Sequence, residues 1–535
     1  MSQHRSYAGV LSVVGVVLLG YGVAITLCAG LGFAFDYVET ADLSRFRSTF
    51  DLLAAAGSTA LVGLVLLLPA RSRQRAPPGP APRFSPRASR GRGDIVTRRE
   101  ATLAVASIWV ATSLAGAAPF WIGAGMSFPD GLFESVSGLT TTGATVITDI
   151  EGRISHPLLL WRSLTQWLGG MGIVVFFVAV FPNLRGGGKH MFGEEVPGTS
   201  SEGLRPRIKE TSSILWRMYL TFTVLTGLGL WLCGMTVFDS ICHAMTAMST
   251  GGFSTRDASI GGFDNAAIEI LLTFVMVFAS VNYGLYYAAY RAVFRPRRTP
   301  GVAVGARVGR AIRDGLRTFA RSPELMTFLI LVLAAFSALA AGHLLAQGAD
   351  PLTAARRAGF MVATTISSTG YGTHDYGVYP SAMLGVMLFL MFVGGCAGST
   401  AGGIKVERVV IMAKITFAEL RSSYRPSLVQ IVRMGTKPVS DGVVTDTLVF
   451  FVLFMAALGT GVVSVCVLEG VPVPTAFGAV LSCLSNMGPA PFHLDADNFA
   501  AYGGFTKVLF AFLMLFGRLE FFALLAVLSP GFWRS

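Results

Sequence analysis

The chain has 535 residues, of which 53% are hydrophobic and only 13% are charged. Charged residues make up roughly 25% of a typical soluble domain, so this composition excludes an ordinary soluble protein. Lysine and arginine outnumber aspartate and glutamate by 42 to 30, which gives a net charge of +12. The excess is concentrated in 71–99 and 291–321, beside apolar segments, where the positive-inside rule accounts for it. We therefore expect a membrane protein with both stretches in the cytoplasm and no nucleic-acid partner.

Ten apolar segments are near or above the ~20 residues needed to cross a bilayer. In chain order they are 7–34, 51–70, 101–122, 157–181, 213–235, 266–290, 324–347, 381–414, 444–469 and 503–529. The first is longer than a signal-peptide core and is interpreted as a retained span. From the third segment on, each pair of spans encloses a shorter apolar segment, at 130–145, 239–253, 355–372 and 474–490. These four are too short to cross, so we expect them to re-enter from the outer face, with both chain ends in the cytoplasm.

The predicted fold is an all-α polytopic membrane protein, with two N-terminal transmembrane helices and four span–pore-loop–span repeats around a pseudo-fourfold pore. Its predicted parts are an N-terminal helix pair (1–70), a basic cytoplasmic linker (71–99) and pore repeats at 100–185, 186–295, 296–437 and 438–535. The six cysteines are scattered, with no CxxC pair. They are interpreted as small buried hydrophobic residues rather than as a metal site or a disulfide framework.

Each re-entrant segment ends in a variant of one short motif. The copies are Thr141-Thr142-Gly143-Ala144, Ser249-Thr250-Gly251-Gly252, Ser368-Thr369-Gly370-Tyr371 and Ser485-Asn486-Met487-Gly488, and the glycines Gly143, Gly251, Gly370 and Gly488 are 108, 119 and 118 residues apart. Backbone carbonyls of an extended loop can replace the water around a cation, and glycine allows the dihedrals that this requires. The third copy comes close to the TVGYG of potassium channels. The pattern predicts a selectivity filter built from these loops, with K⁺ at the carbonyls of Thr142, Gly143, Thr250, Gly251, Thr369, Gly370, Asn486 and Met487.

Aspartates accompany the re-entrant segments. Asp130 and Asp239 begin the first two, where a carboxylate satisfies free amides and the positive end of a helix dipole, so we expect short pore helices there. An aspartate also follows each loop, namely Asp149, Asp257, Asp375 and Asp495. These four either ring the outer mouth and concentrate cations or are ordinary solvated loop acids.

Two features of the later spans point to gating. Five glycines within 394–403 should unwind the span 381–414 midway. We interpret this stretch as a gate, the alternative being close helix packing through small residues. Arg518 lies deep in the last span and is interpreted as facing the pore, the alternative being a partner on a neighbouring helix or snorkelling. The candidate gating residues are Gly398, Ser399, Thr400, Gly402, Gly403, Lys405 and Arg518. The run Gln166 to Gly172 is interpreted as a packing surface.

The four loops, Gly169-Gly170-Met171-Gly172, the stretch Gly394 to Lys405, and Gly517-Arg518-Leu519-Glu520 resemble those of the TrkH-type potassium transporters of bacteria, in the superfamily that includes KtrB and the plant HKT proteins. The resemblance covers nearly the whole chain. It implies filter glycines at Gly143, Gly251, Gly370 and Gly488 and an intramembrane gating loop at 394–403 opposed by Arg518. It further implies homodimers in the bacterial inner membrane, each protomer with its own pore, and a separate cytosolic nucleotide-binding regulatory subunit of the TrkA type. Gly143 at the first filter position implies potassium rather than sodium.

The chain departs from the family pattern at two positions. Ala490 follows the proline of the fourth loop where glycine is more frequent, and Ala401 stands where a third consecutive glycine is usual. The predicted function is gated potassium uptake, with K⁺ as the transported ion, no organic cofactor and no enzymatic activity. One alternative is a sodium-permeable or proton-coupled symporter of the same superfamily. Another, of a different class, is a solute transporter with its site at the membrane midplane.

Overall fold

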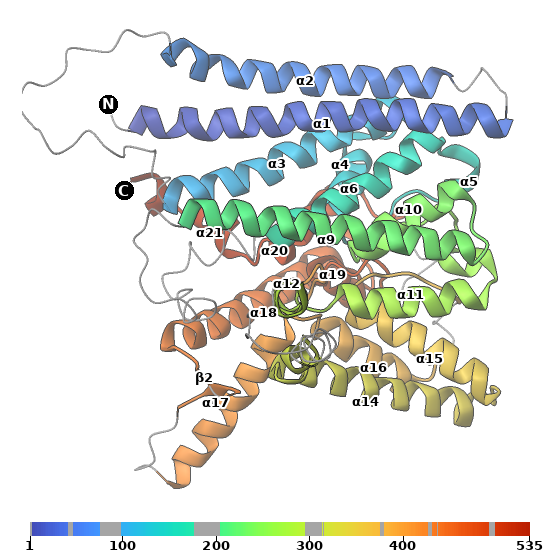
Figure 1. Ribbon diagram of the computed structural model, residues 1–535, viewed down its shortest axis with the longest axis vertical. Helices are drawn as coiled ribbons and strands as arrows, with labels where there is room; N and C mark the ends of the chain where they lie inside the picture. The colour runs from blue at the N-terminus through green and yellow to red at the C-terminus, as the bar shows by residue number, and fades with distance from the viewer. Residues whose placement is uncertain are drawn as a thin grey trace, which may run out of the picture. The chain divides into compact units, whose positions relative to one another are not determined.

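The computed structural model describes residues 3–40, 46–74, 98–175, 204–294, 313, 315–374, 379–425, 431–435, 437–491 and 498–534. In these ranges the chain is almost entirely helical (Figure 1). The helices are α1 (Gln3–Thr40), α2 (Phe46–Gln74), α3 (Arg98–Gly123), α4 (Phe128–Leu139), α5 (Ile150–Arg153), α6 (His156–Val175), α9 (Leu204–Leu232), α10 (Val237–Met248), η4 (Ser259–Phe263), α11 (Ala266–Ala279), α12 (Tyr283–Phe294), α14 (Pro323–Ala346), α15 (Pro351–Ile366), α16 (Ser381–Phe392), α17 (Val406–Tyr424), α18 (Asp441–Glu469), α19 (Val473–Ser485), α20 (Gly504–Arg518), α21 (Phe522–Leu528) and α22 (Pro530–Arg534). A hairpin of β1 (Arg433–Met434) and β2 (Lys437–Pro438) was not predicted.

The chain divides into two compact units. The first comprises Met1–Ser135, Ser155–Trp161 and Leu519–Ser535, and the second comprises Val136–Ile154 and Arg162–Arg518. Helices α4 and α6 therefore each begin in the first unit and end in the second. All the loops predicted to bind ions lie in the second unit.

In the first unit, α1 and α2 run antiparallel and side by side (Figure 1). A Cβ added at Gly15 would lie 2.8 Å from the carbonyl oxygen of Gly63, and one added at Gly63 would lie 2.9 Å from that of Gly15. The two glycines thus let the helix backbones touch, as small residues do between helices in lipid. Val16 and Leu61 are 60% and 62% exposed, which is expected of side chains that contact lipid rather than water.

In the part of the chain that the structure describes, six helices are long and apolar enough to cross a membrane: Gly9–Val38, Arg47–Leu68, Arg99–Gly123, Ser212–Leu232, Pro323–Ala346 and Asp441–Glu469. Among the described residues the number rises to eight if each of two bent helix pairs counts as one span. The predictions of unbroken spans at 503–529 and 266–290 are both wrong, because a break separates α20 from α21 and α11 meets α12 at 84°. At the break, Asn282 Oδ1 accepts the amide of Gly284 at 2.7 Å and the Ser280 carbonyl accepts the amide of Cys396 at 3.0 Å. Side-chain capping and a distant segment have replaced the helical bonds.

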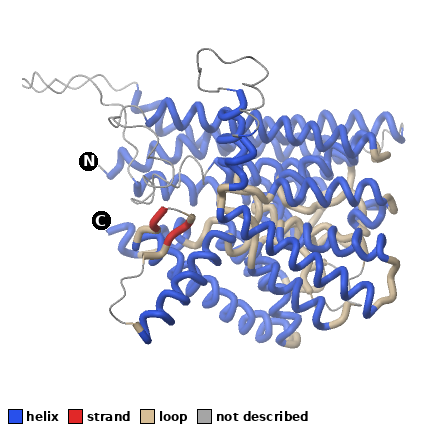
Figure 2. The backbone as a smooth tube through the Cα atoms, turned by 60° about the horizontal axis from the view of Figure 1, so that its bottom comes forward, coloured by secondary structure: helices blue, strands red, loops and turns tan. Residues whose placement is uncertain are grey.

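Four short helices of similar length punctuate the longer ones: α4, α10, α15 and α19. Asp130 lies in the first turn of α4 and Asp239 in that of α10, as predicted, and Thr236 caps α10 by accepting the Asp239 amide at 3.0 Å. Asp350 caps α15 in the same way through the Thr353 amide. The residues that follow these helices, 140–142, 249–251, 367–371 and 486–488, are buried, and in Figure 2 several of the tan loop segments run among the helices. Backbone at that depth is tolerated in a membrane only where it is buried in protein or lines a water-filled path.

Candidate ion-binding site

The four short helices end in one shared backbone conformation. A left-handed residue follows each helix, namely Thr141, Thr250, Ser368 and Asn486, with φ of 55°, 53°, 54° and 53°. The next amide bonds back to the carbonyl five residues earlier: Thr142 to Ser137 (2.9 Å), Gly251 to Thr246 (2.8 Å), Thr369 to Thr364 (2.9 Å) and Met487 to Ser482 (3.0 Å). This is the Schellman motif, which usually carries glycine at the left-handed position. Threonine and serine are unfavourable there, whereas asparagine is tolerated, so the first three loops hold a strained turn out of the helix.

A glycine with positive φ lies two residues after each left-handed residue. These glycines are Gly143 (83°), Gly252 (77°), Gly370 (83°) and Gly488 (94°). The second loop therefore corrects the predicted register: Gly252, and not Gly251, is the counterpart of Gly143. The glycine spacing becomes 109, 118 and 118 residues. The predicted carbonyl pairs Thr250 with Gly251 and Asn486 with Met487 each move one residue on, to Gly251 with Gly252 and Met487 with Gly488.

The four loops contact one another in a closed cycle. A Cβ added at each glycine would lie closer than 3.0 Å to a carbonyl oxygen of the next loop, a distance that real Cβ atoms essentially never show. The pairs are Gly143 with Gly251 O, Gly252 with Thr369 O, Gly370 with Met487 O, and Gly488 with Thr142 O. The contacts run from the first loop to the second, third and fourth, and back to the first. Glycine is thus required at all four positions by its neighbour as well as by its own φ.

Hydroxyl groups of the short helices hold the loops that follow them. Ser137 Oγ donates to Ala144 O at 2.5 Å, Thr364 Oγ1 to Tyr371 O at 3.0 Å and Ser482 Oγ to Gly488 O at 2.7 Å. Thr246 occupies the same position in the second repeat, but its hydroxyl lies 2.5 Å from the Tyr371 hydroxyl of the third loop. The helix before each loop therefore fixes either its own loop or the neighbouring one.

Side chains also close the cycle between the fourth loop and the first. Asn486 Nδ2 donates to Thr142 Oγ1 at 3.0 Å and to the Met514 carbonyl of α20 at 2.9 Å. Gly517, one turn further along α20, lies against the Leu484 carbonyl so closely that a Cβ would overlap it. The fourth loop, which diverges most in sequence, is thus joined to the ring by its asparagine.

The run from Gln166 to Gly172 does more than pack. Gly169 lies against the Leu139 carbonyl at the end of α4, as expected of a packing glycine. Gln166 reaches the second loop, where Nε2 donates to Gly251 O at 2.6 Å and Oε1 accepts the Phe253 amide at 3.1 Å. The sequence interpretation missed this contact. A signal existed, since a glutamine amide in an apolar span needs partners.

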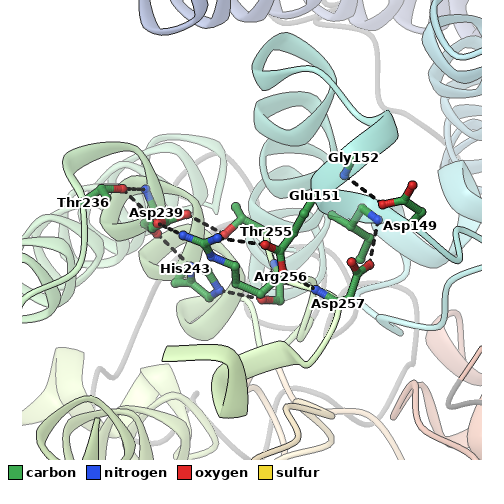
Figure 3. A network of polar contacts seen from close by, with 11 residues as sticks. Asp149, Glu151, Gly152, Thr236, Asp239, His243, Thr255, Arg256 and Asp257 are labelled. Carbon is green, nitrogen blue, oxygen red and sulfur yellow. Dashed lines mark hydrogen bonds and ion pairs between the residues drawn. The ribbon is translucent and has the colours of Figure 1, made fainter. Parts of the chain in front are cut away.

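A polar network joins the segments that leave the first two loops (Figure 3). Arg256 Nη1 pairs with Glu151 Oε2 at 2.9 Å, and its Nη2 lies 3.7 Å from Asp239 Oδ2. Asp257 Oδ1 accepts the Ile150 amide at 2.7 Å, and Asp149 caps α5 through the Gly152 amide. Asp149 and Asp257 therefore hold loop backbone, which favours the alternative that they are ordinary loop acids. Asp375 and Asp495 lie outside the described residues.

The predicted unwinding at 394–403 is confirmed, because the chain is not helical between α16 and α17. The segment 393–405 leaves and returns at one point, where Val393 and Ile404 pair as a parallel bridge. It lies against the C-terminal ends of three short helices. Thr400 Oγ1 donates toward Met248 O (3.3 Å) and Ala279 O (3.2 Å), and the Gly402 amide donates to Ser368 Oγ at 2.5 Å. Gly402 also lies directly against the Ser485 carbonyl.

Three charged side chains form hydrogen bonds with the backbone of this segment. Arg518 is buried, and its Nη1 donates to the Thr400 carbonyl at 2.7 Å, so the two predicted gating elements do meet. Lys405 Nζ donates to the Ala401 carbonyl, within the segment itself. Glu324 of α14 accepts the Ala397 amide at 2.5 Å. Glu324 was not predicted, because a glutamate in the first turn of a helix is also the ordinary partner of the helix dipole.

Comparison with known proteins agrees with this architecture. A sequence profile of the TrkH family, described as a cation transport protein, matches residues 86–531. The chain is 34% identical over 452 residues to the Trk system potassium uptake protein TrkH of Salmonella typhimurium, covering 83% of this chain and 88% of that protein. It is 33% identical over 444 residues to the protein of the same name from Escherichia coli K12, with 82% and 86% covered. The crystal structure of the potassium transporter TrkH from Vibrio parahaemolyticus matches with a TM-score of 0.81 at 27% identity, covering 98% of this chain and 99% of that one.

These matches confirm the predicted fold class, an all-α polytopic membrane protein, and the prediction that the chain is an ion transporter and not an enzyme. They extend over the four loops, the unwound segment and Arg518 together. The chain belongs to the TrkH family of cation transport proteins.

Proposed function

We propose that this chain takes up potassium ions through a gated pore that its own four loops surround. The observation that carries the proposal is the closed cycle of contacts between each loop glycine and a carbonyl of the next loop. Such a cycle surrounds one axis with carbonyls from Thr142, Gly251, Thr369 and Met487 and from the glycines that follow them. Rings of carbonyls that replace a hydration shell select potassium by their number, spacing and field. The printed names of the Salmonella and Escherichia relatives, which are potassium uptake proteins, support the same ion.

The pore is pseudo-fourfold in this proposal, with one chain supplying four unequal loops. The C-terminal ends of α4, α10, α15 and α19 carry the partial negative charge of their helix dipoles, which favours a cation on the inner side of the ring. The basic stretches 71–99 and 291–321 keep both chain ends in the cytoplasm of a bacterial inner membrane. A membrane potential then supplies about 2.3 kcal/mol per 100 mV for each entering K⁺.

The gate is the segment 393–405 on the inner side of the ring, held by Thr400 and Arg518. Its contacts with Met248, Ser368 and the Ser485 carbonyl lie at the helix ends, where an ion leaves the loops. We propose that a separate cytosolic subunit of the TrkA type moves this segment, and that two chains form a homodimer with a pore in each.

The proposal is tested by two measurements, bacterial growth at limiting potassium and ion flux into liposomes. An uptake-deficient bacterium that expresses this chain should grow at limiting potassium, and the purified protein in liposomes should carry K⁺ in preference to Na⁺. A sodium-permeable relative would carry both ions alike, and a proton-coupled symporter would acidify the liposome lumen during uptake. A midplane solute transporter would carry neither ion at a comparable rate. Failure to support growth, together with no potassium flux, would overturn the proposal.

A substitution at Gly143 tests most directly whether the proposed filter distinguishes K⁺ from Na⁺. Its φ of 83° and its contact with Gly251 O leave no room for a side chain, so Gly143→Ser must displace the second loop. We expect the permeability ratio of K⁺ over Na⁺ to fall by about tenfold, equivalent to about 1.4 kcal/mol. An unchanged ratio in folded protein would contradict the assignment of this loop to the filter.

A further inference from the structure

The second loop is held by a side chain in a way that the other three loops are not. Gln166 lies on α6 and bonds both ends of its amide to this loop, with Gly251 O as acceptor at 2.6 Å and the Phe253 amide as donor at 3.1 Å. The Phe253 amide can only donate, so Oε1 must face it and Nε2 must face Gly251 O. Gln166 is fully buried. The amide therefore has one orientation, and its loop bonds are a fixed part of the site.

Gly251 is shaped to accept this amide. A Cβ added at Gly251 would overlap Cδ and Oε1 of Gln166, with Nε2 at 2.8 Å. Its structural counterparts Thr142, Thr369 and Met487 all carry side chains. The second loop thus has a glycine at this position because Gln166 occupies the space that a side chain would need.

The other three repeats have no amide at the corresponding position. Gly169 of α6 and Gly517 of α20 both lie against the carbonyl four residues before a filter glycine, at Leu139 and Leu484, and are therefore equivalent. Gln166 is three residues before Gly169. In the other two repeats the correspondence follows from the sequence, where Met276 stands three residues before Ala279 and Met391 three before Gly394, as Met514 stands three before Gly517. All three methionines are buried. The first repeat thus has Gln166 where the other three repeats have a methionine, a side chain of similar volume.

We propose that Gln166 is a positioning residue that determines ion specificity by fixing the Gly251 carbonyl; this rests on the proposed function as a potassium pore. Gly251 O is the carbonyl that lies against Gly143, within the ring of carbonyls that is proposed above to bind K⁺. A carbonyl oxygen has two lone pairs, so it can accept the Gln166 bond and still face an ion. The bond sets the direction of that oxygen and the width of the ring on this side. Without it, the second loop keeps its backbone bonds, but the Gly251 carbonyl can tilt inward and contact the smaller sodium ion.

The experiment compares Gln166→Met with the matched control Met391→Leu, which changes the equivalent side chain of the third repeat. Purified wild-type and variant proteins are placed in liposomes, and K⁺ and Na⁺ permeabilities are measured alongside thermal unfolding. We expect Gln166→Met to lower the K⁺ over Na⁺ ratio by about tenfold through increased Na⁺ entry, while Met391→Leu keeps the wild-type ratio. An unchanged ratio in folded Gln166→Met would overturn the inference.

Two further variants keep the test decisive if Gln166→Met does not fold. Gln166→Asn retains an amide that is one methylene too short to reach Gly251 O, and Gly251→Ala pushes the amide away from the opposite side. Both should lower the ratio in the same direction, and a wild-type ratio in either folded variant would overturn the inference. The wild type separates the two proposals: if it shows no preference for K⁺, the proposed function fails and the inference with it. If the wild type prefers K⁺ and the variants do so equally, the inference alone fails.

Discussion

The loop ring and the segment 393–405 are both irregular backbone buried among helices, but they are held in different ways. Each loop of the ring is fixed by backbone bonds to its own helix and by a glycine that touches the next loop. The segment 393–405 has backbone bonds at its base, between Gly394 and Ile404 and from Cys396 to the Ser280 carbonyl. The bonds that join its residues 399–402 to other elements run instead through the side chains of Thr400, Arg518 and Ser368. A part held by many backbone contacts resists movement, whereas a part held by a few side-chain bonds can be released at modest cost. The difference supports the proposal that the ring selects the ion and that the segment opens the path.

The largest effect is expected from Gly252→Ala. Its φ of 77° costs a side chain about 1–2 kcal/mol, and the new Cβ would overlap Thr369 O. Because that atom is backbone of the third loop, relief requires both loops to shift. We expect potassium flux into liposomes to fall by more than tenfold. Gly172→Ala is the control, since no atom lies within 4 Å of a Cβ there. Near-normal flux in folded Gly252→Ala would contradict the rigidity assigned to the ring.

Arg518→Ala tests the other part of the comparison, the segment 393–405. It removes a charge-assisted bond to the Thr400 carbonyl, and such bonds contribute about 1.5–3 kcal/mol. If the bond favours the closed segment, its loss should raise flux without the regulatory subunit by about tenfold. Deletion of 397–402 should act in the same direction. Equal or lower flux in either folded variant, measured in liposomes without a partner, would count against a gate at this place.

Thr400→Val should also raise the flux without the regulatory subunit, but by less than Arg518→Ala does. The Thr400 hydroxyl has two acceptors within reach, Met248 O and Ala279 O, and can donate to one of them at a time. The lost bond is worth about 1 kcal/mol, or about a fivefold rise in flux. Thr400→Ser keeps the hydroxyl and should behave as the wild type. If serine and valine raise flux equally, the methyl packing of Thr400 matters and the hydrogen bond does not.

The sequence predicted the parts of the site that glycine and buried charge reveal. Five glycines in 394–403 indicated the unwound segment, and the charge of Arg518 in an apolar span indicated a polar partner there. The register of the second loop was wrong because Gly251 and Gly252 are adjacent and each fits the motif. The left-handed conformation of Thr250, the positive φ of Gly252 and the contact of Gly252 with the Thr369 carbonyl distinguish them.

The break between α11 and α12 had no sequence signal of comparable strength. Ser280-Val281-Asn282 contains neither glycine nor proline. The helix ends there because the Ser280 carbonyl accepts a hydrogen bond from the Cys396 amide and the Asn282 side chain caps the next helix. Cys396 is more than a hundred residues away in the chain, at the start of the gating segment. A local pattern cannot contain an interaction of that kind, so the unwound segment was predictable from its own glycines and the break between α11 and α12 was not.

The smallest effect is expected at Asp350, which caps α15, the helix that carries the third loop. Its carboxylate accepts hydrogen bonds from the Thr353 hydroxyl and from the Thr353 amide, the latter at 3.0 Å, and these two bonds lower the pKa of Asp350 below its ordinary value of 3.8. A lowered pKa means that the charge stabilises the folded chain above pH 3.8, and that this contribution is lost as the pH falls through the lowered value.

Asp350→Asn keeps a capping oxygen without the charge, whereas Asp350→Ala removes both. At pH 7 the melting temperature should be highest for the wild type, slightly lower for asparagine and lowest for alanine, with the gap between wild type and asparagine closing in strong acid. The K⁺ over Na⁺ ratio should not change, because the cap lies at the far end of the helix from the ring. A changed ratio would show that the outer end of a pore helix contributes to selection, and would weaken the division between ring and gate.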